Sequence, residues 1–202
     1  MAENFLRIAF TPSVLDAQRR AYGRAQGPLP GESRGAVDAI GPDERAFIEA
    51  RDSFYMATVS ETGWPYVQHR GGPAGFLRVL DARTIAFADV RGNRQLVSAG
   101  NLAHDARVAL ILVDYPRRAR LKVLGRASVL DPKEHPELAA QLLPAGKVER
   151  IVRIDVVGLD WNCPQNLTPR YTEAEVEEYA SVLRARIAEL EAELATRADG
   201  RT

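Results

Sequence analysis

Cysteine is almost absent from this chain of 202 residues, which holds a single one, Cys163. One cysteine excludes an internal disulfide framework and any metal site built from several thiolates. A chain of this length buries about 70% of its unfolded surface, so it folds without such covalent support. The cysteine count therefore favours a protein of a reducing compartment.

An excess of charge and long apolar runs are missing too. Lys plus Arg and Asp plus Glu both number 27, so no overall field draws in nucleic acid or an anionic membrane. No apolar run reaches the ~18 residues of a membrane span, and the start, MAENFLRIAF, lacks the features of a signal peptide. We expect a cytoplasmic protein with no nucleic-acid or membrane partner.

The familiar catalytic motifs are also missing. The sequence has no GxxxxGK[ST] phosphate loop, no GxGxxG, no HExxH and no GxSxG. Its three histidines, His69, His104 and His135, lie far apart, and we expect the last two at the surface. No metal site is predicted.

The middle of the chain has the pattern of short strands joined by tight turns. Strands are expected over 53–60, 64–70, 76–81, 84–89, 107–115, 119–130 and 147–161, with helices over 12–22, 43–51, 93–101 and 132–143. Short turns make antiparallel neighbours, whereas parallel strands need a helix between them. The expected fold is mainly β, of the α+β class: a small antiparallel barrel with flanking helices.

The two ends differ from this middle. Residues 1–41 are expected to form an N-terminal helical arm, whose part from 23 to 41 holds five glycines and two prolines and is expected to be extended rather than core. Residues 42–161 form the barrel domain. Residues 162–202 are a loop followed by a long C-terminal amphipathic helix.

The C-terminal helix opens with a capping box, Thr172 and Glu175. Apolar residues then follow at alternating spacings of four and three: Val176, Ala180, Leu183, Ile187, Leu190 and Leu194. This heptad seam favours an ordinary amphipathic helix lying on the barrel; the alternative is a helix pairing with its twin in a dimer, for which three heptads is the lower limit of the signal.

Two segments contain more polar side chains than is usual for a strand end or a strand-to-helix turn. Gln68, His69 and Arg70 end an otherwise apolar strand and put donors on both faces of the sheet; the plain alternative is a strand running out into a polar bend. Asp89–Gln95 (DVRGNRQ) joins a strand to a helix start, where free N–H groups and Arg94 suit a phosphate, although such turns are common.

A third segment, Asp160–Gln165 (DWNCPQ), follows the last strand. Its Trp161 offers a stacking surface beside amide groups, or alternatively plugs the open end of the barrel. Cys163 precedes a proline, with no histidine placed beside it, and this position favours a bystander over a nucleophile.

Four of these features occur in one order. They are Gly63-Trp64-Pro65, Phe87, Asn93-Arg94-Gln95 and Arg107-Val108-Ala109-Leu110. In this order, over residues 43–161, the chain resembles the pyridoxamine 5'-phosphate oxidase-like family, the flavin-binding split barrels. The resemblance implies an antiparallel split β-barrel, a homodimer, and FMN in a cleft between the subunits.

The resemblance assigns FMN contacts to four groups of residues: Gln68, His69 and Arg70; Phe87, Ala88 and Asp89; Asn93, Arg94 and Gln95; and Arg120, Trp161 and Gln165. The first group would meet the flavin edge or the phosphate, the second the ribityl chain, and the third the phosphate. In the fourth, Arg120 would lie near the pyrimidine end, with Trp161 and Gln165 closing the pocket from the partner subunit. Arg70 or Arg120 would stabilise the charge of the reduced flavin.

The chain also departs from the family's name-giving enzymes. Gln68 stands where they have an arginine, Pro73 stands about where their substrate-binding lysine lies, and DWNCPQ replaces their C-terminal Trp and Arg-x-His cluster. We therefore expect an FMN-dependent oxidoreductase of another small molecule rather than a true pyridoxamine phosphate oxidase. The alternatives are a flavin, deazaflavin or haem carrier without turnover, and a structural dimer with an empty cleft.

Overall fold

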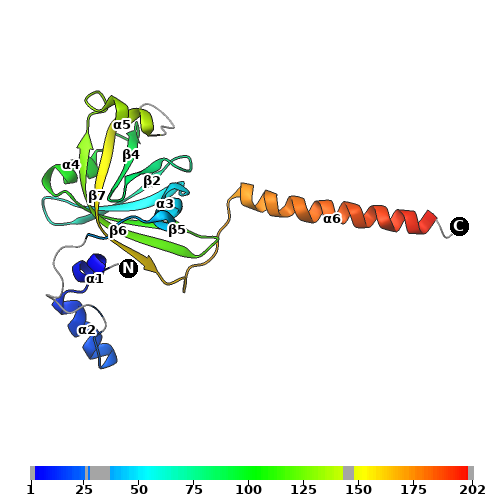
Figure 1. Ribbon diagram of the computed structural model, residues 1–202, viewed down its shortest axis with the longest axis horizontal. Helices are drawn as coiled ribbons and strands as arrows, with labels where there is room; N and C mark the ends of the chain where they lie inside the picture. The colour runs from blue at the N-terminus through cyan, green and yellow to red at the C-terminus, as the bar shows by residue number, and fades with distance from the viewer. Residues whose placement is uncertain (1–2, 26, 28–36, 143–147, 200–202) are drawn as a thin grey trace. The chain divides into compact units, whose positions relative to one another are not determined.

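The computed structural model describes residues 3–25, 27, 37–142 and 148–199 (Figure 1). Its strands are β1 (Ser53–Val59), β2 (Pro65–Gly71), β3 (Leu77–Asp81), β4 (Thr84–Val90), β5 (Arg107–Asp114), β6 (Ala119–Leu130) and β7 (Val148–Asn162). Its helices are α1 (Glu3–Ala9), α2 (Pro12–Tyr22), α3 (Pro42–Glu49), α4 (Val97–His104), α5 (Pro136–Gln141) and α6 (Glu173–Asp199). The fold class expected from the sequence is confirmed.

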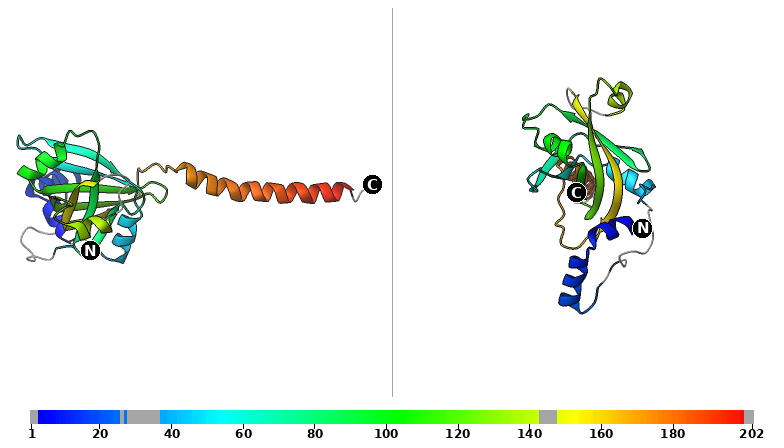
Figure 2. Two further views of the ribbon diagram at one scale, coloured as in Figure 1. Left: turned by 90° about the horizontal axis from the view of Figure 1, so that it is seen from above. Right: turned by 90° about the vertical axis from the view of Figure 1, so that its left-hand side faces the viewer.

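The seven strands form one antiparallel sheet in the order β2-β1-β5-β6-β7-β4-β3. The sheet curves strongly, so that β2 comes near β4 (Figures 1 and 2). A bulge between Leu124 and Gly125 bends β6 against β7. A Cβ at Gly125 would lie 2.7 Å from the Ile154 side chain, so this close approach requires glycine.

The barrel interior is filled by the inward-facing residues of the strands. Phe54 of β1 stacks on Phe76 with ring centroids 5.6 Å apart and meets Phe87 of β4 edge-on at 5.4 Å. Such aromatic pairs stabilise by about 0.5–1.5 kcal/mol beyond their buried area. These contacts join the two sides of the curved sheet into one core.

The N-terminal arm differs from its expectation. Helix α1 had no sequence signal, and Ile40, at the end of the glycine-rich segment, is buried in the core instead of lying in an extended arm. Asp38 is buried beside it and accepts hydrogen bonds from the backbone N–H groups of Phe5 (3.0 Å) and Leu159 (3.1 Å). The glycine and proline content is a property of the whole segment and gives no sign that Asp38 and Ile40 are buried. Most of the segment, residues 28–36, lies outside the described residues.

Two other helices are shorter than expected. Helix α4 begins at Val97 rather than near Asn93, because Arg94 and Leu96 have positive φ angles of 62° and 56° that interrupt helical geometry. Helix α5 begins at Pro136, which cannot continue a helix from the residues before it. In the described part of the chain, no helix combines the length and the hydropathy that crossing a membrane would require.

The chain divides into two units, one of residues 1–114 and 119–165 and one of residues 115–118 and 166–202. In the second unit, the expected capping box is present: Glu175 Oε2 accepts from the Thr172 backbone N–H at 2.8 Å, and the Glu175 N–H donates back to Thr172 Oγ1. The Arg170 guanidinium stacks on the Tyr115 ring at 5.0 Å and links the two segments of this unit.

Candidate functional site

Strand β2 presents alternate side chains to the two faces of the sheet. Gln68 and Arg70 face inward and are half-buried, whereas His69 is exposed and meets Tyr55 edge-on with ring centroids 5.4 Å apart. The polar run expected to place donors on both faces does so because side-chain direction alternates along a strand. Only two of its three residues therefore share the inner face.

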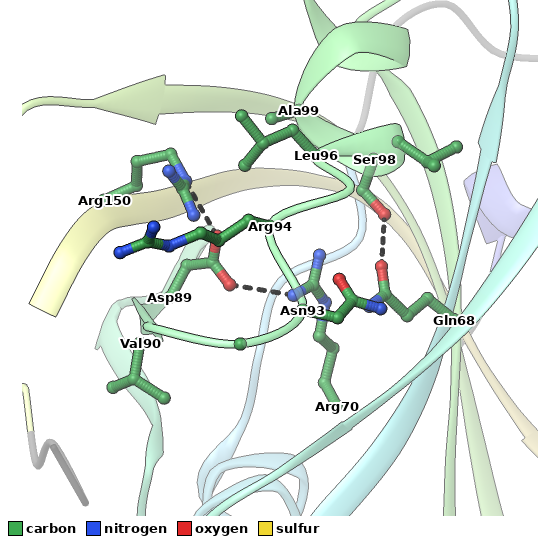
Figure 3. A pocket seen from close by; sticks show the side chains of 12 residues that line it. Gln68, Arg70, Asp89, Val90, Asn93, Arg94, Leu96, Ser98, Ala99 and Arg150 are labelled. Atoms are coloured by element: carbon green, nitrogen blue, oxygen red, sulfur yellow. Dashed lines mark hydrogen bonds and ion pairs between the residues drawn. The ribbon is translucent and has the colours of Figure 1, made fainter.

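Asp89 joins the two ends of the curved sheet. Its Oδ1 accepts from Arg70 Nη1 of β2 at 2.8 Å, and its Oδ2 accepts from Arg150 Nε of β7 at 2.9 Å (Figure 3). Arg70 and Asp89 lie on strands that do not pair in the sheet, so this ion pair links the two ends across the split. Arg150 lies opposite Asp89 in the β4–β7 register.

The segment after β4 is a strained loop. Asn93 folds it locally, because its Oδ1 accepts from the Gln95 N–H at 3.1 Å and its Nδ2 donates to Gln95 Oε1 at 3.3 Å. A left-handed conformation costs a residue other than glycine about 1 kcal/mol or more, and such strain gathers at ligand sites. Arg94 and Leu96 both adopt it.

Helix α4 begins at this loop without a side-chain cap. The N–H groups of its first turn have no partner within the helix, and they carry the positive end of the helix dipole. Ser98, in that turn, donates its hydroxyl hydrogen to Gln68 Oε1 at 3.0 Å (Figure 3). The NH₂ group of the Gln68 amide has no hydrogen-bond partner among the residues that the structure describes.

A cavity of about 190 Å³ lies among these elements (Figure 3). Its polar side chains are Gln68, Arg70, Asp89, Asn93, Arg94, Ser98 and Arg150. They include three guanidinium groups and one carboxylate, so the lining has a net charge of +2. Arg94 makes no hydrogen bond or ion pair with any residue that the structure describes.

Five of the residues assigned to FMN from the sequence therefore line one cavity: Gln68, Arg70, Asp89, Asn93 and Arg94. Phe87 is instead buried in the core beneath the Arg70 guanidinium, 5.7 Å from its ring centroid. Ala88 packs in a smaller apolar cluster around Ile151, and Gln95 bonds to Asn93 at the rim. With His69 on the outer face, these four residues do not line the cavity.

Arg120, Trp161 and Gln165 lie elsewhere in the first unit. The Arg120 guanidinium donates to the backbone carbonyls of Cys163 and Gln165 and so holds the loop after β7. Trp161 meets Phe47 edge-on at 4.7 Å, and its indole N–H donates to Glu44 Oε1 at 2.8 Å. None of the three lines the cavity. Their cofactor contacts stay a prediction, which for Trp161 and Gln165 involves the partner subunit.

Sequence reasoning missed Arg150 and Ser98. Arg150 looked like one of the outward-facing charges of an amphipathic strand, and only its register opposite Asp89 brings it to the cavity. Ser98 is small and buried, and the residues around it in the sequence give no sign of a binding role. Only the packing of α4 against β2 brings it to Gln68. Within the described ranges, no cluster of His, Cys, Asp and Glu side chains could hold a metal ion.

Among known proteins, residues 40–154 match the family described as pyridoxamine 5'-phosphate oxidase. No curated protein matches the chain. Similar solved structures include HupZ from Group A Streptococcus (17% identity, 65% of this chain and 99% of that one, TM-score 0.48).

Two further similar structures are an FMN-binding protein from Syntrophomonas wolfei and a protein related to general stress protein 26 from Clostridium acetobutylicum. The first shares 14% identity over 59% of this chain and 83% of its own, with a TM-score of 0.45. The second shares 12% identity over 59% of this chain and 85% of its own, with a TM-score of 0.45. These likenesses are distant, whereas the family match spans more than half of the chain, and on that match the protein belongs to the pyridoxamine 5'-phosphate oxidase family.

Proposed function

We propose that this protein is an FMN-dependent oxidoreductase that acts on a small molecule and holds the FMN phosphate in the cavity between β2, β4 and α4. The observation that carries the proposal is the charge of that cavity. Three arginines face one carboxylate, which leaves two positive charges, and a phosphate monoester carries close to two negative charges at neutral pH.

The donors of the cavity also suit a phosphate. Arg94 has no partner among the described residues, and a guanidinium can give a phosphate two parallel hydrogen bonds. The Nε of Arg70 is buried without a hydrogen-bond partner in the described chain, which is costly unless a ligand or water supplies an acceptor. The open N-terminus of α4 adds backbone N–H groups.

Asp89 keeps this charge in place. By accepting from Arg70 and Arg150 at once, it fixes two guanidinium groups that would otherwise repel each other. It also cancels one of the three positive charges and so adjusts the cavity to a dianion. We assign Asp89 a positioning role.

FMN would supply hydride transfer at its ring, and the protein would supply binding and orientation. Gln68 is held by Ser98, and its NH₂ group, which has no partner in the described chain, can donate to a carbonyl or phosphate oxygen. Arg70, whose guanidinium lies over Phe87, is the cation of the cavity nearest the barrel core. For the stabilisation of negative charge on the reduced cofactor, the candidates are Arg70 and Arg120, because each has a buried Nε that lacks a hydrogen-bond partner in the described chain.

A homodimer is part of the proposal. Exposed apolar side chains gather on the β1–β2 hairpin, where Tyr55, Trp64 and Val67 face outward. Apolar and aromatic surface of this kind is typical of the core of homodimer interfaces. A second copy on this face would bring further side chains to the ring of FMN.

The test begins with the absorption spectrum of the purified protein and the identity of the cofactor released by heat. FMN in the supernatant, with peaks near roughly 375 and 450 nm, supports the proposal. Protein that is colourless and binds no added FMN overturns it, and haem or a deazaflavin in its place would assign the fold to the carrier role instead.

A second measurement tests the phosphate site itself. The apoprotein is titrated with FMN and with riboflavin, which lacks the phosphate. Two or more charge-assisted hydrogen bonds predict an FMN affinity at least about a hundredfold higher. Equal affinities would contradict the placement of the phosphate in this cavity. Reoxidation of the reduced cofactor by an added small-molecule acceptor then separates turnover from binding alone.

A further inference from the structure

Within the second unit, helix α6 has an apolar face that no described residue of that unit covers. The seam of Val176, Leu183, Ile187, Leu190 and Leu194 has side chains that are between 40% and 65% exposed. From Val176 to Leu194 the seam rises about 27 Å along the helix, at 1.5 Å per residue. Scattered exposed leucines are ordinary, but a continuous stripe of them marks a contact surface.

The helix needs such a contact for its own stability. In water, isolated helices draw little stability from propensity, and most of it comes from packing of the amphipathic face. The capping box at Thr172 and two intrahelical ion pairs, Arg184–Glu177 and Arg186–Glu189, are exposed and contribute little. A partner that covers the seam would supply the packing that stabilises the helix.

We infer that α6 pairs with α6 of a second copy of this chain, as a parallel two-stranded coiled coil in register. The alternating spacing of four and three residues fixes the heptad positions of the seam. Val176, Leu183 and Leu190 occupy d positions, and Ala180, Ile187 and Leu194 occupy a positions. Leucine at d with a β-branched residue at the central a position, Ile187, favours two parallel strands over trimers. The small Ala180 fits the same geometry.

The charges beside the seam select the orientation. In a parallel pair, each g position faces the e position of the next heptad in the partner, which sets Arg186 against Glu191 of the partner subunit on both sides. Tyr179 then lies opposite Arg184 of the partner subunit, a favourable aromatic–cation pair. Arg186 can turn from its exposed contact with Glu189 to do this, because that contact holds it weakly.

The antiparallel arrangement puts like charges together. Matching the a layers of one helix to the d layers of the other sets Arg184 against Arg184 and Arg186 against Arg186 at the centre. It also sets Glu177 against Glu191 at both ends. Like charges across an interface discriminate against that arrangement. Charge complementarity therefore favours the parallel, in-register pair.

Cysteine crosslinking of the full chain tests this geometry. In a Cys163→Ser background, Leu190→Cys places a thiol at a d position, and Ala192→Cys places one at an f position on the opposite face. A parallel register brings the two Cα atoms of position 190 within the ~4.4–6.8 Å that a disulfide spans. With oxidised glutathione, we expect disulfide-linked dimer from Leu190→Cys and monomer from Ala192→Cys on non-reducing gels.

The control keeps the result interpretable. Linkage at neither position, or equal linkage at both, overturns the inference, because chance collisions do not distinguish the two faces. An antiparallel pair also gives no linkage at 190, since that residue then faces Ala180 of the other helix. Leu190 and Ala192 are both exposed in the single chain, so neither substitution removes a contact of the barrel core.

A charge exchange provides the second test. Arg186→Glu and Glu191→Arg each place like charges across the parallel pair, and each should lower the yield of linked dimer at position 190. The double variant restores the attraction and should restore the yield. A double variant as weak as the single ones would overturn the assigned register, whatever the state of the barrel.

The inference is independent of the proposed cofactor. FMN affinity is measured at the cavity of the first unit, and linkage at position 190 is measured on α6. Loss of FMN binding with intact linkage would therefore remove the proposed function and leave the coiled coil, and the reverse result would do the opposite.

Discussion

The barrel unit holds two arginine-containing sites that look alike in the sequence and differ in the fold. At the cavity, Arg70 and Arg150 share the carboxylate of Asp89, and Arg94 has no partner among the described residues. At the loop after β7, Arg120 donates to two backbone carbonyls and closes a structural contact. The difference therefore lies in Arg94, whose whole guanidinium has no partner in the described chain, whereas the Nη2 of Arg120 is used by the loop.

The difference also explains why the resemblance assigned both sites to the same cofactor. Family patterns align residue types along the chain, and arginine is equally suited to binding a phosphate and to holding a loop. The partner of each guanidinium decides between the two uses, and that partner is set by tertiary packing. Variants that remove one charge at each site can sharpen or break this distinction.

The largest effect is expected from Asp89→Asn, on stability. The substitution removes the negative charge that two arginines share, and all three of these side chains are at least three-quarters buried. Breaking a fully buried ion pair costs about 3–5 kcal/mol, so we expect about 2–3 kcal/mol here from urea unfolding. Asp155→Asn, which breaks an exposed pair with Arg153, is the control and should change the free energy of unfolding little. Equal losses would contradict the shared role of Asp89.

Arg94→Ala should weaken FMN binding strongly and leave the fold intact. Removing a charge-assisted donor costs about 1.5–3 kcal/mol, which lowers the FMN affinity about 10- to 100-fold. Riboflavin affinity should change little, because riboflavin has no phosphate to lose the contact. Arg91→Ala, in the same loop but outside the cavity lining, is the matched control. An unchanged FMN affinity in Arg94→Ala would remove Arg94 from the phosphate site.

Arg120→Ala should affect the loop after β7 more than the cofactor. It loses two hydrogen bonds to backbone carbonyls, and we expect about 1 kcal/mol of local stability to go with them. Amide exchange at Asn162, Cys163 and Gln165 should become faster, while FMN affinity falls less than in Arg94→Ala. A cofactor loss as large as that of Arg94→Ala would instead support the contact that the sequence assigns to Arg120.

Most of the fold and about half of the residues that line the cavity could be predicted from the sequence. Alternating apolar residues predicted the strands, and strand periodicity placed Gln68 and Arg70 on one face. The rest depended on where the sheet's ends meet. Arg150 reaches the cavity through the β4–β7 register, and Ile40 reaches the core through a segment whose composition is that of a loop. Local patterns contain neither piece of information.

The smallest effect is expected at an exposed pair that no ligand needs. Asp105 accepts hydrogen bonds from the side chain of Arg107, the larger effect, and from its backbone N–H. Together they lower the pKa of the Asp105 carboxyl from 3.8 to about 2. Because the folded pKa lies below the ordinary value, the pair stabilises the fold above about pH 4, and this contribution is lost as the pH falls towards 2. Arg107→Ala should therefore raise the Asp105 pKa in an NMR titration, only part of the way to 3.8 since the backbone hydrogen bond remains. FMN binding at neutral pH should not change, and a change would show that exposed arginines also contribute to the field of the cavity. If the Asp105 pKa stayed near 2 in the variant, the backbone N–H of residue 107 alone would cause the shift. The Arg107 side chain would then not change the pKa, even though it forms a close ion pair.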